Sequence, residues 1–575
     1  MKKHNTIFIL FFLFTISAIA QPSYEVKKKF TKADSLRGEI TPFRSCYDIL
    51  MYDLDIKIDI ENKFISGSNT IKFLTVKNFK TLQVDLFSNM KIEKILYNTK
   101  ELKFTRQFDA VFVTFPDSIR KGTAQSIKVF YSGNPQVAKN PPWDGGFTWT
   151  TDKDGNPFVG VSCQGTGASL WYPCKEHQSD EPNEMLIRVA VPNGLNEISN
   201  GRLKRTTHLD NNYTRFEWYV SYPINNYDVT VNIGKYKHIK DFYKNKDYPD
   251  TLTLDYYVLP YNATKAEKQF AQVKPMMDAY YNYFGEYPFV NDGYKLVEAP
   301  FLGMEHQSCI AYGNKFKNGY LGYDRSGTGY QFDYIIIHES AHEWWGNSVT
   351  SSDIADMWIH EGFGTYAEAL YIEYLYGHDA YLEYINAEKK DISNDEAIIG
   401  RYNVNNEGSG DMYSKGAMLL HTIRSLMDDD PRFFAIIRGI QDKYKYQSVT
   451  SAEVEKYFND LSGINFSSLF NVYLRTKCIP TLEIILWKDF MDLKANYYYK
   501  FKTVTTDEEE QIIKLSHFSM PVKITTDKNV FTEIYPSIDG QQTINLKDMH
   551  PEDFKVATDL YYIDLHIYNE TDIEK

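Results

Sequence analysis

The sequence predicts a multidomain α+β protein with three folded parts: an N-terminal antiparallel β domain, a mostly helical domain and a C-terminal β-sandwich. Its 575 residues are enough for about three to four domains. Apolar residues recur with the period of a β-strand in many short runs between residues 47 and 236. Helical spacing dominates from about residue 263 to residue 461, and after Ile479-Pro480 short β runs return.

Residues 1–20 have the pattern of a secretory signal peptide. Two lysines precede the apolar run 7–14, and Ala18-Ile19-Ala20 is a small-x-small cleavage site. The apolar run is too short for a good membrane anchor, and no other segment approaches transmembrane length. We therefore expect a soluble mature chain that is exported to the periplasm or the extracellular space. The short signal with its leading lysines is typical of a bacterial source.

The β domain is predicted from alternation and turn signals. Residues 52–60 alternate apolar and polar side chains, as in a strand with one buried face. Shorter β runs follow at 111–115 and 186–191, and Asp154-Gly155 is a hairpin turn signal. Strands joined by tight turns pair antiparallel, so we expect large and mostly antiparallel sheets.

The helical domain is expected to begin with a strand at 252–259 that leads into a helix at about 263–284. Further helices are expected at 367–376, 415–427 and 452–461. The C-terminal strands are predicted at residues 482–486, 497–503, 522–524 and 530–535. The predicted domains are the signal peptide 1–20, the β domain 21–247, the helical domain 248–477 and the β-sandwich 478–575.

Charge and cysteine content limit the possible partners and bonds. The formal net charge of -13 argues against a nucleic acid as a partner. The cysteine count of 5 is odd, so at least one thiol is unpaired or intermolecular. Cys163 and Cys174 are close enough in sequence to form a disulfide, and packed free thiols fit the sequence equally well.

The most informative segment is His338-Glu339-Ser340-Ala341-His342, with Glu361 farther along the chain. On a helix, His338 and His342 lie on one face about one turn apart, which suits two corners of a zinc tetrahedron. Glu339 lies beside the metal and can accept a proton from a zinc-activated water. Glu361, from a second helix, would complete a His₂Glu set with one open position, which is a catalytic arrangement.

The residues around this motif favour the helix that it needs. The preceding run 332–337 is largely apolar, and Gly346 in Trp344-Trp345-Gly346-Asn347 is a helix-stop signal. A pair of histidines on a helix can also be structural, and chance matches of this motif occur in about a few per cent of chains this long. The helical context favours a zinc hydrolase.

Three further segments carry residue types that such a site uses. Gly303-Met304-Glu305-His306 precedes the zinc motif, Tyr413 opens a predicted helix beyond Glu361, and Ser162-Cys163-Gln164 belongs to the β domain. Each segment alone is a weak signal, because a glycine before an apolar residue is usually a turn and a tyrosine at a helix start usually packs.

Together with the zinc motif, these segments resemble peptidase family M1, the gluzincin aminopeptidases. The resemblance extends over almost the whole mature chain, and the flanks Trp344-Trp345-Gly346-Asn347 and Glu361-Gly362-Phe363 strengthen it. It implies a thermolysin-like catalytic domain between the β domain and the β-sandwich. Because the sequence ends after the predicted sandwich, the chain resembles a short secreted member that lacks the C-terminal helical domain of many relatives.

The resemblance implies a role for each matching position. His338, His342 and Glu361 would bind one zinc ion per chain, and Glu339 would be the general base. Tyr413 resembles the tyrosine that stabilises the oxyanion of the tetrahedral intermediate.

The same resemblance implies a set of substrate contacts. Residues 302–306 resemble the exopeptidase motif Gly-x-Met-Glu-Asn, so Gly303 and Met304 would contact substrate and Glu305 would hold its α-amine. Gln164 resembles the glutamine or glutamate of the first domain that also contacts the amine.

Two positions in the exopeptidase motif depart from the family pattern. Leu302 stands where the family has glycine, and His306 stands where it has asparagine. That stretch lines the first side-chain pocket, so the departures concern specificity more than the reaction.

The sequence therefore predicts a secreted zinc metallo-aminopeptidase that hydrolyses the N-terminal bond of peptides. A zinc endopeptidase of the thermolysin type is one alternative, because it shares the zinc motif but needs no acidic amine anchor. A non-catalytic peptide-binding protein on a peptidase fold is another, although such proteins usually lose the base or a ligand. The first-residue preference and the oligomeric state cannot be read from the sequence.

Overall fold

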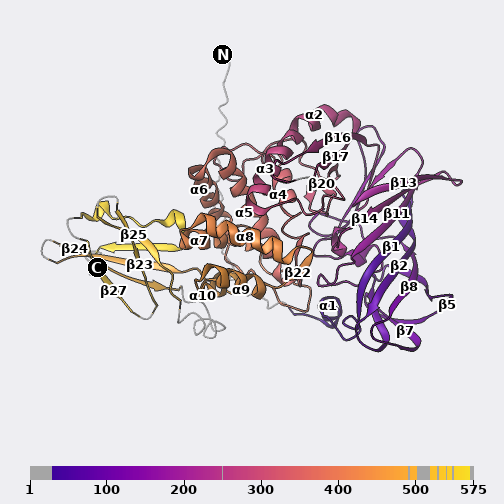
Figure 1. Cartoon of the computed structure of the whole chain (residues 1–575), viewed down its shortest axis with the longest axis horizontal. Coiled ribbons are helices and arrows are strands. Elements are labelled where there is room, and N and C mark those ends of the chain that lie inside the picture. The colour runs from indigo at the N-terminus through magenta and orange to yellow at the C-terminus, as the bar shows by residue number, and fades with distance from the viewer. Residues whose placement is uncertain are drawn as a thin grey trace, which may run out of the picture.

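The computed structural model describes residues 29–248, 250–489, 492–501, 518–527, 530–538, 540–546 and 549–569. The predicted signal peptide lies outside these residues. Figure 1 shows an elongated molecule whose helical part lies between two β parts, with the N-terminal strands at one end and the C-terminal strands at the other. The first two parts of the predicted fold class, an N-terminal β domain and a mostly helical domain, are confirmed.

The N-terminal part begins with the short helix α1 (Lys32–Gly38) and continues as three sheets. The largest sheet contains, in spatial order, β13 (Arg202–Leu209), β14 (Tyr213–Val220), β11 (Glu184–Pro192), β1 (Tyr47–Asp59), β2 (Phe64–Thr75), β8 (Ala124–Gly133), β4 (Met90–Tyr97) and β5 (Lys100–Glu101). The others are β3 (Phe79–Asp85), β7 (Ala110–Ile119) and β6 (Lys103–Gln107), and β12 (Asn196–Ile198), β15 (Asn232–Gly234), β10 (Pro157–Ser162) and β9 (Gly146–Thr151). Neighbouring strands are antiparallel except β1 and β11.

Strand β1 illustrates why these residues form a sheet. Tyr52, Leu54, Ile56 and Ile58 are all buried, and the residues between them are partly exposed. Burying each such side chain contributes about 1.5–3 kcal/mol, so the period-two pattern fixes which face meets the core. The predicted hairpin is also present, because β9 and β10 pair antiparallel on either side of the turn at Gly155.

The middle part combines a small sheet with most of the helices. Its sheet contains, in order, β16 (Lys237–Tyr243), β17 (Leu252–Val258), β18 (Tyr294–Glu298), β20 (Ile310–Tyr312) and β19 (Gly303–Met304). Strand β16 pairs with β17, so this sheet includes residues before the predicted boundary at 247/248. The boundaries stay predictions.

The helices of the middle part follow the predicted positions with some differences. The expected helix at 263–284 is divided by a 3₁₀ turn at 270–272 into two helices. The α-helices are α2 (Ala263–Gln269), α3 (Val273–Phe284), α4 (Tyr334–Ala341), α5 (Trp358–Tyr376), α6 (His378–Ala387), α7 (Ser414–Met427), α8 (Asp430–Tyr444), α9 (Ser451–Ser462) and α10 (Ser467–Arg475). Two short strands, β21 (Val349–Ser351) and β22 (Gln447–Val449), pair in parallel.

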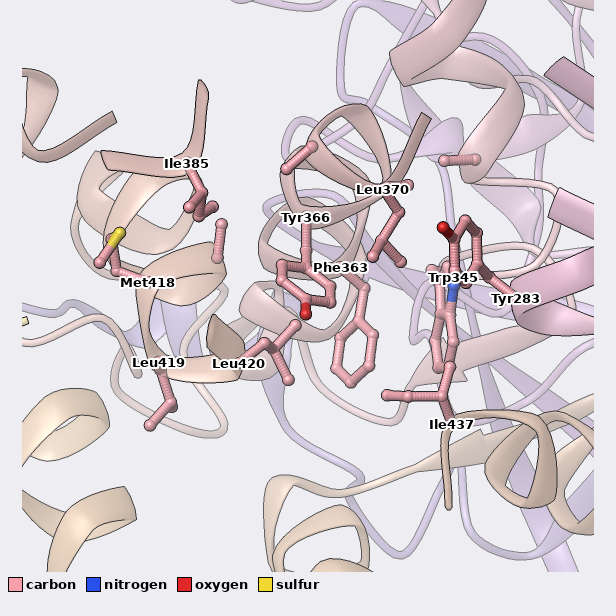
Figure 2. Packing of buried hydrophobic residues seen from close by; sticks show 14 of the residues in the cluster. Tyr283, Trp345, Phe363, Tyr366, Leu370, Ile385, Met418, Leu419, Leu420 and Ile437 are labelled. Atoms are coloured by element: carbon pink, nitrogen blue, oxygen red, sulfur yellow. The ribbon is translucent and has the colours of Figure 1, made fainter. Parts of the chain in front are cut away.

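Helix α5 is the centre of the helical part. Its first fifteen residues, 358–372, are all buried, so the helix is surrounded by other elements. Figure 2 shows Phe363 and Tyr366 of this helix between Trp345 and Ile437 on one side and Leu420 on the other. The Phe363 and Trp345 rings stack with their centroids 4.1 Å apart. Such a buried helix is a rigid support for any side chain that it carries.

The C-terminal part consists of strands in the described residues. A four-stranded sheet contains β27 (Gln542–Leu546), β24 (Asp492–Lys500), β23 (Thr481–Asp489) and β28 (Asp564–Asn569), and β25 (Val522–Asp527) pairs with β26 (Val530–Ile534). Within the described residues, the four predicted β runs overlap β23, β24, β25 and β26, although Phe501 and Tyr535 lie outside the strands. That the two sheets complete a β-sandwich stays a prediction.

Two further expectations concern thiols and membranes. Cys163 and Cys174 are free thiols and both are buried, so the alternative of a disulfide between them is wrong for this structure. Cys46 and Cys309 are also buried, and Cys478 is half-buried. Within the described ranges, none of the helices has the length and apolar content needed to cross a membrane.

Candidate metal centre and active site

The three predicted zinc ligands come together between two helices. His338 lies on α4, His342 is the residue that caps this helix, and Glu361 lies in the first turn of α5. The Nε2 atoms of the histidines are 3.2 Å apart, and the Oε2 atom of Glu361 lies 3.3 Å from Nε2 of His338 and 3.5 Å from Nε2 of His342. All three side chains are buried.

These separations fit a zinc ion. Ligand atoms about 2.1 Å from a metal at the corners of a tetrahedron lie about 3.4 Å apart, which matches the observed triangle. The charges also fit. Burial alone would raise the pKa of Glu361, but the two histidines lower it, so the carboxylate is ionised. Burial alone would lower the pKa of His342, but the Glu361 carboxylate raises it to about 9. A divalent cation can replace the protons that this carboxylate holds on the imidazoles.

A second layer of hydrogen bonds orients the two imidazoles. Nδ1 of His338 lies 2.8 Å from Oε1 of Glu368, whose other oxygen accepts a 2.6 Å hydrogen bond from the Tyr384 hydroxyl. Nδ1 of His342 lies 2.9 Å from the carbonyl oxygen of Trp345. With Nδ1 as the donor, each ring turns its unprotonated Nε2 toward the shared point, as metal binding requires.

Replacing Glu368 with glutamine should weaken zinc binding about tenfold, because the acceptor for His338 keeps its place but loses its charge. The measurement is the zinc dissociation constant from competition with a chelator, with circular dichroism to check the fold. Tyr384→Phe is the control, because it removes only the outer hydrogen bond and should have a smaller effect. An unchanged zinc affinity in Glu368→Gln would contradict the assigned role.

Glycines allow the elements to approach the centre closely. A Cβ at Gly364 of α5 would lie 3.0 Å from Cε1 of His342 and 3.3 Å from Cε1 of His338. A Cβ at Gly303 would lie 2.8 Å from Oε1 of Glu339, closer than real Cβ atoms approach. Gly303 is therefore needed so that β19 can run alongside the predicted general base.

The predicted amine anchor lies next to the triad. Glu305 is 2% exposed, and its Oε1 accepts hydrogen bonds from Nε2 of Gln164 at 2.5 Å and from the Tyr227 hydroxyl at 3.2 Å. Nε2 of Gln164 also donates to Oε1 of Glu361 at 2.9 Å. Gln164, from the N-terminal β part, is thus brought to Glu305 and Glu361 of the helical part. Burial raises the pKa of Glu305 to about 8, with His342 opposing the shift.

The remaining predicted residues line the same cleft, whose volume is about 630 Å³. Glu339 and Met304 line it, and the half-buried Tyr413 stacks on the His338 ring at 5.9 Å between centroids. Tyr334 lies on the same ring at 5.2 Å. Every predicted site residue is therefore at one cleft. His306, which departs from the family motif, is fully buried, and neither ring nitrogen has a hydrogen-bond partner.

Three residues at the site were missed in the sequence. Glu368 follows Glu361 by two helical turns on one face of α5, and Tyr334 precedes His338 by one turn, so their spacing could have identified them. Tyr227, which joins Glu305 to His360, lies in a single 3₁₀ turn at 226–228, and no spacing points to it.

Two family models match consecutive parts of the sequence. The Peptidase M1 N-terminal domain matches residues 49–227, and the Peptidase family M1 domain matches residues 268–473. The chain belongs to peptidase family M1. The second match contains the triad, and the first contains Gln164, so the cleft of this M1 member is built from both family domains.

Three relatives of the chain are distant from it in sequence. A bovine glutamyl aminopeptidase is 22% identical over 66% of this chain and 42% of its own length, and a leucyl aminopeptidase of Saccharolobus solfataricus is 24% identical over 69% and 49%. The M1 chain thus spans less than half the length of these two curated relatives. It spans 73% of the leukotriene A-4 hydrolase of Xenopus laevis, at 22% identity over 76% of this chain.

The fold agrees with a solved family member. An M1 zinc metallopeptidase mutant from Deinococcus radiodurans, bound to a Tyr-Ser-Ala substrate, matches with a TM-score of 0.63 and 20% identity. The match covers 76% of this M1 chain and 97% of the other. At this identity it supports the shared fold.

Proposed function

We propose that this protein is a zinc aminopeptidase that removes the first residue from peptides with a free N-terminus. The observation that carries the proposal is the carboxylate of Glu305, which lies with Gln164 and Tyr227 beside the His338, His342 and Glu361 triad. A triad alone supports zinc hydrolysis in general. An acidic group at this place adds a partner for an ammonium group and so favours an exopeptidase.

A zinc ion held by the triad would lower the pKa of a bound water and polarise the carbonyl of the scissile bond. Glu339 belongs to a second group of potential ligand atoms, with Glu305 and His342, that lie within 4.8 Å of one another. Burial raises the pKa of Glu339, and the histidines oppose the rise. In the proposed reaction its carboxylate accepts a proton from the attacking water and later donates it to the leaving amine.

Tyr413 is proposed to stabilise the oxyanion. Its ring is fixed against His338, and burial holds the pKa of its phenol well above the ordinary value, so the hydroxyl keeps its proton. The hydroxyl can donate a hydrogen bond to the substrate oxygen as negative charge develops there. One such donor contributes about 3–4 kcal/mol to transition-state stabilisation.

In the proposed amine site, the ammonium group of the substrate replaces a hydrogen-bond donor of the protein. The amide nitrogen of Gln164 bridges Glu305 and Glu361, two carboxylates that need a donor between them. An ammonium group carries a full charge and three donors, so it bridges them better than an amide. The amide oxygen of Gln164 is then available to accept a hydrogen bond from the same ammonium. This places the first peptide bond of the substrate at the metal.

The proposal includes one zinc ion per chain and export through residues 1–20 to the periplasm or the extracellular space. We also propose that the C-terminal strands complete a β-sandwich, because the inward side chains of β23, β24 and β25 belong to one buried cluster. The substrates would then be peptides outside the cytoplasm.

A panel of fluorogenic amino-acyl amides, each free and N-acetylated, tests the proposal directly. We expect cleavage of the free-amine compounds alone, and its loss with a zinc chelator. Cleavage of the acetylated compounds would favour the endopeptidase alternative. No cleavage of either set by zinc-loaded protein would favour a non-catalytic peptide-binding protein.

Replacing Glu305 with glutamine should lower kcat/KM for free-amine substrates by about 30- to 1,000-fold, because the ammonium loses a buried charged partner worth ~2–4 kcal/mol. Steady-state kinetics measures this effect, and zinc content should not change. The N-acetylated compounds should stay uncleaved by both proteins. An unchanged kcat/KM for the free-amine compounds would remove Glu305 from the amine site.

A further inference from the structure

Tyr227 is buried beside the proposed amine anchor and contacts it directly. Its hydroxyl and the side-chain amide of Gln164 both donate to Oε1 of Glu305, at 3.2 and 2.5 Å. Among the described residues, these two side chains are the donors to that carboxylate. The carbonyl oxygen of Tyr227 in turn accepts a hydrogen bond from Sγ of Cys163 at 3.3 Å. The two donors to Glu305 therefore come from segments of the N-terminal β part that are in contact with each other.

His360 contacts the same hydroxyl from helix α5. Its Nδ1 lies 3.4 Å from the Tyr227 oxygen, and the two rings stack with their centroids 6.4 Å apart. His360 is fully buried, and its Nε2 accepts a hydrogen bond from the backbone N–H of Ser351 at 2.9 Å. A Cβ at Gly346 would lie 3.2 Å from Nδ1 of His360, so the glycine leaves the space that this ring occupies.

These contacts determine the direction of each hydrogen bond. A backbone N–H can only donate, so Nε2 of His360 is an acceptor and carries no proton. The proton of the neutral imidazole is then on Nδ1, where the Tyr227 oxygen can accept it. The Tyr227 hydroxyl donates its own proton to Glu305. We call this chain of hydrogen bonds the relay, and it runs from Ser351 through His360 and Tyr227 to Glu305.

The relay is needed most when a substrate is bound. In the proposed amine site, the ammonium group takes the place of the Gln164 amide between Glu305 and Glu361. Tyr227 is then the side chain that still donates to Glu305, so it keeps the carboxylate in its orientation. His360 and Glu361 are consecutive residues of the buried helix α5. The relay therefore holds the amine anchor at a fixed distance from the helical turn that carries a zinc ligand.

We propose that Tyr227 and His360 are positioning residues that hold Glu305 at the distance from the metal that an N-terminal ammonium group requires. This inference rests on the proposed aminopeptidase function and deepens it. Neither residue needs to touch the substrate, because both act through the carboxylate of Glu305. The relay thus affects ligands that carry an amine, whereas a merely structural role would affect every ligand of the zinc site alike.

The test measures the binding of two inhibitors to the zinc-loaded protein by calorimetry. One is leucine hydroxamate, and the other is the same compound without its amino group. Both can bind zinc through the hydroxamate, but only the first has an ammonium group for Glu305. In Tyr227→Phe the preference for leucine hydroxamate should fall about three- to tenfold, as for the loss of one hydrogen bond, with the affinity of the other compound unchanged. KM for leucyl amide should rise by a similar factor, and kcat should change less.

Tyr236→Phe is the matched control. It also removes one tyrosine hydroxyl, which donates to the backbone carbonyl oxygen of Glu298 at 2.9 Å, and Tyr236 is not among the residues that line the cleft. This variant should bind both hydroxamates as the wild type does. The zinc content should be the same in every variant.

A double-mutant cycle tests whether the two residues act in series. His360→Phe keeps a flat ring but has no N–H to donate, so it should weaken the binding of leucine hydroxamate about two- to fivefold. In the Tyr227→Phe background the same change should have little further effect, because residues of one hydrogen-bond network are not additive.

Equal weakening of both hydroxamates in Tyr227→Phe would indicate a structural role and overturn the inference. An unchanged preference in Tyr227→Phe, or fully additive effects of the two substitutions, would overturn it as well, and each of these results leaves an aminopeptidase. A wild type that binds the two hydroxamates equally and cleaves no free-amine compound would instead overturn the proposed function.

Discussion

Glu339→Gln should lower kcat for amino-acyl amides by about 10²- to 10⁴-fold, the range that one general base contributes. Glutamine keeps the shape of the side chain beside Gly303, so the close packing there is preserved. It cannot accept the proton of the attacking water or return it to the leaving amine. The steady-state rate with the preferred amide measures the effect.

The control for this variant is its zinc content, measured by elemental analysis after dialysis. We expect one zinc ion per chain in both proteins, because Glu339 is not among the three side chains that form the proposed zinc tetrahedron. KM should change far less than kcat, since the amine anchor is elsewhere. Turnover at the wild-type rate by the glutamine variant would eliminate Glu339 as the base.

Removing zinc should abolish turnover and lower the thermal stability of the protein. The three ligands are buried, and without the cation the Glu361 carboxylate and the two imidazoles lose the ion that would join α4 to α5. A ligand that binds only the folded state adds about 4 kcal/mol of stability when its free concentration is 1,000 times its dissociation constant. Thermal melts of the apo and zinc-loaded proteins, together with the amide assay, measure both losses.

Adding metal back to the apo protein distinguishes the loss of zinc from damage by the chelator. Stoichiometric zinc should return both activity and melting temperature, whereas calcium or magnesium should return neither, because the site offers two nitrogen donors. Equal melting temperatures with and without zinc, after verified removal of the metal, would show that the triad does not hold it in the folded protein.

The helices that the sequence predicted are those with uninterrupted periodicity. Helix α8 was not among the predicted helices, although Phe433, Ile436, Ile437 and Ile440 follow helical spacing. At the first turn of a helix the missing N–H of proline costs nothing, so Pro431 marks a start. Helix α6 follows α5 after Gly377 alone, and a single glycine with a positive φ reverses the chain there.

The candidate site was predicted unevenly, and distance along the chain explains why. His338, Glu339 and His342 are local neighbours, so helical spacing alone brings them together. Gln164 is 141 residues from Glu305, and only the family resemblance linked the two. The order in which strands pair is equally hard to predict from the sequence. No periodicity indicates that β1 pairs in parallel with β11, because alternation determines which side chains face the core and not which strands are neighbours.

The position of Gln164 has a consequence for product release. The proposed zinc ligands all come from α4 and α5 or the residue that caps α4, but Gln164 belongs to the N-terminal β part. Loss of the Gln164 contacts would therefore leave the triad intact. A substitution at Gln164 would loosen the hold on a free amino acid without removing a metal ligand, so turnover and metal retention can be tuned separately.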